Sequence, residues 1–138
     1  MFLTDTNIWL ELLLGQEKAE QTDKMLQEIP LCKLAISDFA LHSIGVILDR
    51  NNKYQEFNDF IEDIIITGKT KLITLSAKQL QKVTILLKNT GFDFDDAYQT
   101  IVMQENNLQL ITFDKDFAKQ NIKTYNPIEA IEYYNANS

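Results

Sequence analysis

The sequence is poor in residues that mark several common classes of protein. It contains one cysteine, one histidine, two prolines and four glycines among 138 residues. The single cysteine, Cys32, excludes an internal disulfide, and we expect its thiol to be a buried spectator. One cysteine and one histidine cannot form a metal-binding cluster of those residues, and the glycines form no phosphate-binding loop. Any chemistry must therefore reside in other side chains.

Long apolar runs are also lacking. No stretch approaches the roughly 20 apolar residues that a membrane-spanning helix needs. Residues 1–5 contain no basic side chain and end on an acid, unlike the start of a signal peptide. We therefore expect a cytoplasmic protein that has no membrane partner.

Positive charge is in deficit, because 13 lysines and arginines face 20 aspartates and glutamates, giving a net charge of −7. Proteins that bind nucleic acid usually neutralise phosphates with lysine and arginine, so a broad basic surface is not expected. This obstacle is smaller if the acids are concentrated in a pocket that binds divalent cations, because bound cations reverse the local potential. The net charge alone does not separate these two cases.

The length and the 45% hydrophobic content suit one domain with a hydrophobic core, and we expect a single domain over residues 1–138. Short apolar runs alternate with segments of helical spacing. Strands are expected at 1–4, 31–36, 71–75, 108–113 and 122–125, with helices at 8–15, 17–29, 53–66, 76–88 and 94–106, after Ser37 and after Pro127. This alternation predicts an α/β fold of three layers, with helices on both faces of a mostly parallel sheet of about four to five strands.

The stretch 91–97 contains three carboxylates within four positions, at the expected start of a helix. Their mutual repulsion can be compensated by the partial positive charge of the helix N-terminus or by a divalent cation. Two more acids, Asp5 and Asp114, directly follow expected strands. Ligand sites in parallel sheets lie beyond the carboxyl ends of the strands, so Asp96 is expected to meet these two acids there.

Each acid also fits a structural role. Asp93 and Asp96 fit a helix N-cap followed by an acid at the third helical position, and Asp5 and Asp114 fit turns that end strands. Asp95 is expected to face solvent. Acids gathered in a pocket without a cation would repel one another and raise their pKa values. Because Mg²⁺ and Mn²⁺ prefer oxygen ligands, we favour a metal site.

Three ordered segments resemble the motifs of PIN-domain proteins, and in particular the VapC-type ribonuclease toxins of bacterial toxin–antitoxin modules. They are Phe2-Leu3-Thr4-Asp5-Thr6-Asn7, Asp93-Phe94-Asp95-Asp96-Ala97 and Leu110-Ile111-Thr112-Phe113-Asp114-Lys115-Asp116-Phe117. The resemblance implies a PIN-like fold and a Mg²⁺- or Mn²⁺-dependent endoribonuclease that hydrolyses phosphodiester bonds of single-stranded RNA. It also implies the role of a type II toxin, an antitoxin partner that blocks the acidic pocket, and a homodimer.

The resemblance assigns roles to residues at matching positions. The implied catalytic acids are Asp5, Asp96 and Asp114, which also bind the metal together with Asp116. The implied supporting residues are Asn7, Thr112 and Asp93.

One element of the family pattern is missing. PIN nucleases usually carry a glutamate on the helix after the second strand, where this chain has Ser43, or His42 if the register shifts by one. Asp38 and Asp49 lie on other faces of that helix, roughly 120° to 140° away, and do not replace it. The lone His42 is expected at the surface or in a satisfied core position, with an approach to the acidic pocket as the sharper alternative.

The missing glutamate and the negative net charge leave an alternative function open. The chain could be a catalytically weak or inactive PIN-like module that binds RNA or a protein partner. A phosphotransferase or phosphatase with an aspartyl nucleophile is a weaker alternative. That chemistry favours a second acid two residues after Asp5, where this chain has Asn7.

Overall fold

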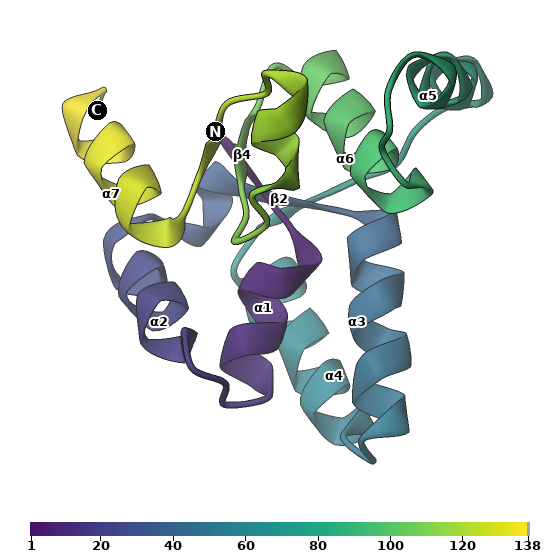
Figure 1. Ribbon diagram of the computed structural model, residues 1–138. Coiled ribbons are helices and arrows are strands. Elements are labelled where there is room, and N and C mark those ends of the chain that lie inside the picture. The colour runs from purple at the N-terminus through teal and green to yellow at the C-terminus, as the bar shows by residue number, and fades with distance from the viewer. Residues whose placement is uncertain (138) are drawn as a thin grey trace.

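The computed structural model describes residues 1–137 and has a five-stranded sheet at its centre (Figure 1). The strands are β1 (Phe2–Thr4), β2 (Leu34–Ser37), β3 (Lys71–Ile73), β4 (Gln109–Ile111) and β5 (Thr124–Tyr125). Their order is β3-β2-β1-β4-β5, and all neighbouring strands are parallel. The first strand therefore lies in the middle of the sheet, at the point where the strand order reverses.

Helices and short turns connect the strands. The α-helices are α1 (Thr6–Leu13), α2 (Ala19–Glu28), α3 (Asp38–Arg50), α4 (Tyr54–Phe60), α5 (Ala77–Asn89), α6 (Phe94–Glu105) and α7 (Pro127–Ala136). Three further helical segments are η1 (Leu31–Lys33), η2 (Ile61–Thr67) and η3 (Asp116–Gln120). None of the helices within residues 1–137 is both long and apolar enough to cross a lipid bilayer.

The sheet separates two hydrophobic cores, because successive side chains of a strand point to opposite faces. Phe2 and Ile111 join the core under α1, α2, α3, α4 and α7. Leu3 and Leu110 join the core under α5, α6 and η3. This arrangement confirms the expected three-layer α/β/α fold.

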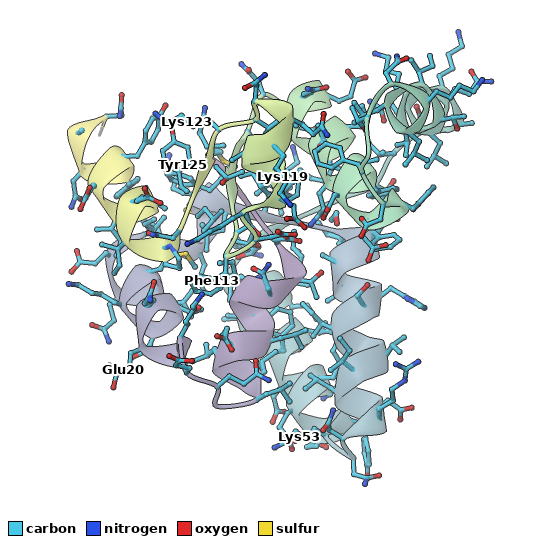
Figure 2. The ribbon with its side chains drawn as sticks, viewed as in Figure 1. Glu20, Lys53, Phe113, Lys119, Lys123 and Tyr125 are labelled. Carbon is cyan, nitrogen blue, oxygen red and sulfur yellow. The ribbon has the colours of Figure 1, made fainter. Side chains whose placement is uncertain are left out.

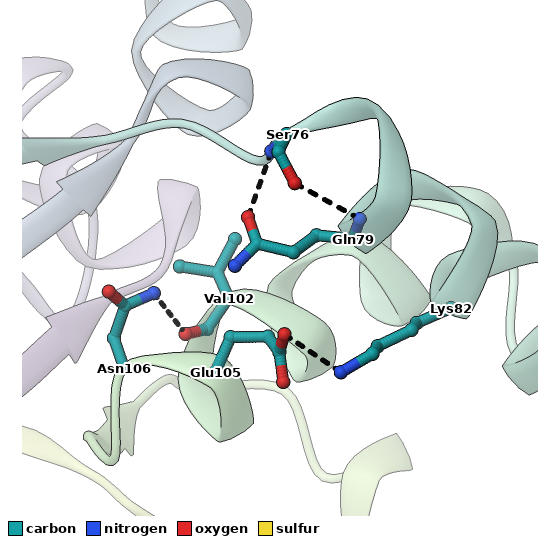
Figure 3. A network of polar contacts seen from close by, with 6 residues as sticks. All are labelled: Ser76, Gln79, Lys82, Val102, Glu105 and Asn106. Carbon is teal, nitrogen blue, oxygen red and sulfur yellow. Dashed lines mark hydrogen bonds and ion pairs between the residues drawn. The ribbon is translucent and has the colours of Figure 1, made fainter.

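Helices α5 and α6 pack against each other, and the start of α6 also meets the start of α3, where Phe39 contacts Tyr98 with ring centres 5.2 Å apart (Figure 1). Ser76 and Gln79 form a capping box that starts α5, in which the Ser76 hydroxyl accepts from the Gln79 backbone N–H at 3.2 Å (Figure 3). Lys82 of α5 forms an ion pair with Glu105 of α6 at 2.9 Å. The cap and the ion pair fix the outer layer that presents the start of α6 to the sheet edge.

Two segments differ from the expectations. The strand expected at 31–36 begins only at Leu34, because residues 31–33 form a 3₁₀ turn after Pro30. Cys32 lies in this turn and is exposed, so the prediction of a buried thiol is wrong. The helix expected at 53–66 is an α-helix only to Phe60 and continues as a π-helix in η2, a segment rich in β-branched isoleucines that are poor α-helix formers.

Candidate active site

Asp5 follows β1 at the carboxyl edge of the sheet and is the N-cap of α1. Its carboxylate accepts a hydrogen bond from the Thr6 backbone N–H at 2.8 Å. Two side chains from distant elements also donate to it, Gln99 Nε2 at 3.0 Å and Thr112 Oγ at 2.8 Å. These three donors fix the orientation of a partly buried carboxylate.

Thr112 and Asn7 connect the ends of β1 and β4. Asn7 donates through Nδ2 to the Thr112 hydroxyl at 3.0 Å and accepts from the Phe113 backbone N–H at 3.1 Å. The same hydroxyl accepts from the backbone N–H of Asp114 at 3.0 Å. Asn7 and Thr112 therefore connect the turn that contains Asp5 to the turn that contains Asp114.

Gln99 is a residue of this site that the sequence analysis missed. Its side chain is buried and bridges two elements, because Nε2 donates to Asp5 while Oε1 accepts from the Ser37 hydroxyl at 2.8 Å. Ser37 is also the N-cap of α3 and accepts from the Ala40 backbone N–H. A signal is present in the sequence, since Gln99 is polar and lies one helical turn after Asp96, but a polar residue within a helix does not by itself indicate which other element it contacts.

Three other carboxylates converge beside Asp5. Asp96, Asp114 and Asp116 each offer one oxygen, and these oxygens all lie within 4.8 Å of one another. Asp96 stands in the first turn of α6, whose N-cap is Asp93, and the Asp93 carboxylate accepts from the Asp96 backbone N–H at 3.0 Å. Asp116 is exposed and forms an ion pair with Lys119 at 3.1 Å.

The crowding of negative charge affects proton affinity. Burial, followed by the charges of neighbouring carboxylates, raises the pKa of Asp96 to about 7. Burial raises the pKa of Asp5 as well, although its three hydrogen bonds oppose the rise. Burial and nearby acids also raise the pKa of Asp95, which is exposed yet lines the same pocket rather than facing only solvent.

Five of the acids line an open pocket of about 340 Å³, namely Asp5, Asp93, Asp95, Asp96 and Asp114. Asp116 lines a neighbouring depression that shares Asp96 with this pocket. Ser43 of α3 reaches this pocket and offers a hydroxyl where the family pattern has a glutamate. His42, the neighbouring residue, lines a different depression with Gly45 and Asp49, so it does not approach the acids. Asp38 is also directed elsewhere, because its carboxylate accepts from the Tyr98 hydroxyl at 2.6 Å.

The donor set of this pocket suits a hard divalent cation. It consists of carboxylate oxygens, with neutral oxygens and amides around them and no cysteine or histidine. One oxygen each of Asp96, Asp114 and Asp116 lies within 4.8 Å of the other two, so these residues are close enough to approach one ion together. Within residues 1–137 no group donates a hydrogen bond to the Asp96 carboxylate. That carboxylate is available to a metal ion.

Comparison with known proteins identifies the family. The family model of the PIN domain matches residues 2–123. The chain belongs to the PIN domain family. This match confirms the resemblance drawn from the three sequence motifs. A comparison with curated proteins found no significant match.

Solved structures share the fold of this PIN domain. VapC20 from Mycobacterium tuberculosis, a sarcin-ricin loop cleaving toxin, has a TM-score of 0.77 at 18% identity, over 92% of this chain and 100% of VapC20. A toxin–antitoxin complex from Klebsiella pneumoniae has a TM-score of 0.69 at 24% identity, over 86% of this chain and 91% of the matched chain. FitAcB from Neisseria gonorrhoeae has a TM-score of 0.70 at 20% identity, over 93% and 99%.

Proposed function

We propose that this PIN-domain protein is a Mg²⁺- or Mn²⁺-dependent endoribonuclease that hydrolyses phosphodiester bonds of single-stranded RNA. The observation that carries the proposal is the convergence of Asp96, Asp114 and Asp116 beside the hydrogen-bonded Asp5. Membership of the PIN family supports nuclease chemistry. The toxins among its structural neighbours support a role as the toxin of a type II module in the cytoplasm.

The acids have separate roles in this proposal. Asp5, Asp96 and Asp114 hold the ion, and Asp116 binds it through water or binds a second ion. A bound Mg²⁺ or Mn²⁺ ion supplies a Lewis acid for the phosphate and lowers the pKa of a water molecule. Thr112 orients Asp5 and Asp114 through its hydroxyl. Asp93 fixes the first turn of α6 and thereby the backbone of Asp96.

The same pocket suits an antitoxin. Besides the acids, its lining includes Leu10, Phe39 and Ile47, and it includes no lysine or arginine. Such a pocket complements a peptide that carries apolar side chains and a basic group, which would cover the acids and prevent RNA from reaching them. A homodimer, as the family resemblance implies, is also part of the proposal.

Replacing a single acid tests the assignment. Asp96→Asn and Asp5→Asn should each abolish Mn²⁺-dependent cleavage of single-stranded RNA, because each removes a charged metal ligand and leaves the side-chain shape unchanged. Asp23→Asn, at an exposed position on α2, is the control with the same change in net charge. Cleavage is followed on denaturing gels, and folding by circular dichroism. Cleavage that survives both substitutions contradicts the assigned site.

The presence of Ser43 in place of the family glutamate favours a second candidate function. In this alternative the protein is a catalytically weak or inactive module that binds RNA or a protein partner. The pocket lacks the family glutamate, and no other acid of α3 lines it. Calorimetric titration with Mn²⁺ separates the two candidates. Saturable Mn²⁺ binding that is lost in Asp96→Asn supports the nuclease. If Mn²⁺ does not bind to the wild-type protein, the result supports the module that binds RNA or a protein partner.

A further inference from the structure

Lysines border the acidic centre on one side only. The pocket toward α3, described above, includes no lysine or arginine. A second groove toward β5 shares Asp114 with that pocket and is lined by Lys18 and Lys115. A third depression shares Asp96 and includes Lys119. Positive charge therefore approaches the acids from the side of β4 and β5, although the chain as a whole is acidic.

We propose that the groove toward β5 binds the RNA backbone next to the cleaved bond. We call it the lysine groove and define it by Lys18, Gln21, Phe113, Lys115 and Thr124. This inference rests on the proposed ribonuclease function and adds the path of the substrate to it. The strand enters the acidic centre at Asp114, because this residue belongs to both the groove and the pocket.

The two lysines of the groove are available for phosphate. Neither Lys18 nor Lys115 forms an ion pair with a carboxylate within residues 1–137, whereas Lys119 is paired with Asp116. The Lys18 ammonium lies 4.9 Å from the centre of the Phe113 ring, a contact that places its charge over the groove wall. An ammonium without a carboxylate partner loses no ion pair when it binds a phosphate.

The rest of the groove suits a nucleotide. Phe113 provides an aromatic wall that is held in place by its backbone hydrogen bond to Asn7. The side chains of Gln21 and Thr124 make no hydrogen bond within residues 1–137, so both can bind a base or a ribose. Glu129 also lines the groove, but its carboxylate caps α7 by accepting from the Asn126 backbone N–H at 2.9 Å.

Single-stranded nucleic acid is the occupant that this combination favours. Proteins bind single strands with cationic grooves that follow the backbone and aromatic rings that stack on the bases. The groove has a volume of about 370 Å³ and is open to solvent, as a continuous strand requires. Figure 2 shows Phe113 near the middle of the view, with Lys119 and Lys123 above it and Lys53 at the lower end of the molecule.

Charge reversal in the groove tests the inference. The double variant Lys18→Glu with Lys115→Glu is compared with Lys71→Glu and Lys78→Glu, two exposed positions at the β3 edge that change the net charge equally. Affinity for a fluorescein-labelled single-stranded RNA is measured by anisotropy in Ca²⁺, with gels to verify that the RNA stays intact. The groove variant should bind at least about tenfold more weakly and lower the slope of log K against log salt by about 2.

Further measurements distinguish failure of the lysine-groove proposal from failure of the proposed ribonuclease function. The groove variant should keep the circular dichroism spectrum of the wild-type protein and should still bind Mn²⁺, because the four carboxylates assigned to the ion are unchanged and neither lysine forms an ion pair within residues 1–137. Equal loss of RNA affinity in the groove and control variants overturns the inference, even if the wild-type protein cleaves RNA. If the wild-type protein binds RNA through the two lysines but never cleaves it, the groove is supported and the proposed enzyme function fails.

Discussion

Gln99 joins two elements of the site through one amide group. Its carboxamide oxygen accepts from the N-cap of α3, and its nitrogen donates to the carboxylate of Asp5. A neutral donor at this position holds Asp5 without neutralising it. Gln99 therefore acts as a positioning residue, because it orients a carboxylate that would bind the metal.

Gln99→Met tests this role at nearly constant volume. The substitution removes a donor to Asp5 and leaves the buried Ser37 hydroxyl without its acceptor, which should cost about 1–3 kcal/mol of unfolding free energy. Mn²⁺ affinity should fall by about tenfold, as for other groups that orient a metal ligand. Urea unfolding measures the change in unfolding free energy, and calorimetry measures the change in Mn²⁺ affinity. Gln104→Met, on the exposed face of the same helix, should change neither, and unaltered Mn²⁺ affinity in Gln99→Met would reject the positioning role.

The sequence shows which acids follow strands, but it does not show contacts between distant helices. Asp5 and Asp114 could be proposed because an acid directly after a buried strand is visible in a linear pattern. Gln99 could not, because its position depends on the rotation of α6 relative to α3 and on a contact with Asp5 across 94 positions. Asp95 is exposed, as expected, but it also lines the acidic pocket, which the spacing along one helix does not show.

At the scale of elements, the rotation of α3 about its axis decides which side chains reach the acids. Ser43 lines the acidic pocket, whereas His42, about 100° around the helix, lines a separate depression. The prediction that Ser43 takes the place of the family glutamate depends on this rotation. Substitutions at the consecutive positions Ser43 and His42 test it directly.

Ser43→Glu should supply a further carboxylate to the pocket. Without metal, it should destabilise the protein because a like charge is added near Asp5, and Mn²⁺ affinity should rise because the ion gains a ligand. His42→Glu carries the same new charge on the same helix and should leave Mn²⁺ affinity unchanged. Calorimetry compares the two variants. A gain in affinity that is equal in both would show that net charge, rather than the position on α3, is responsible.

The positions of most elements followed from the sequence, because apolar runs and helical spacing depend on local residues. The π-helical segment η2 did not, because a segment of seven residues is too short for its isoleucines to distinguish the spacing of an α-helix from the wider spacing of a π-helix. The start of β2 was also misplaced. Leu31 to Lys33 have the apolar character of a strand, but they precede the first position that pairs with β1.

At the scale of the whole molecule, the acidic centre lowers the stability of the metal-free protein. An aspartate in an unfolded chain has a pKa near 3.9, whereas the folded structure raises the pKa of Asp96 to about 7 and raises that of Asp5. Between these values the folded state binds more protons than the unfolded state. The contribution of these carboxyl groups to stability is therefore fully present below the unfolded pKa and is lost as the pH rises through about 7.

The melting temperature measures this effect. In a chelator, the protein should melt a few degrees lower at pH 8 than at pH 5, and Asp96→Asn should remove most of the difference. Mn²⁺ at about a hundredfold excess over its dissociation constant should add about 2.7 kcal/mol to the unfolding free energy. This gain should be larger at the higher pH, because protons no longer compete for the carboxylates. A melting temperature that rises with pH in the chelator contradicts the prediction.

The pairing of β1 with the distant strand β4 determines when the acidic centre can form during synthesis. β1 pairs on one side with β4, and the hydrogen bond from Thr112 to Asp5 spans 107 positions of the chain. Asp5 is therefore synthesised 107 positions before Thr112, its hydrogen-bond partner. A nascent or truncated chain that stops before β4 lacks Thr112, Asp114 and Asp116. Such a fragment cannot assemble the acidic centre, which forms only after β4 and the turn that follows it have been synthesised.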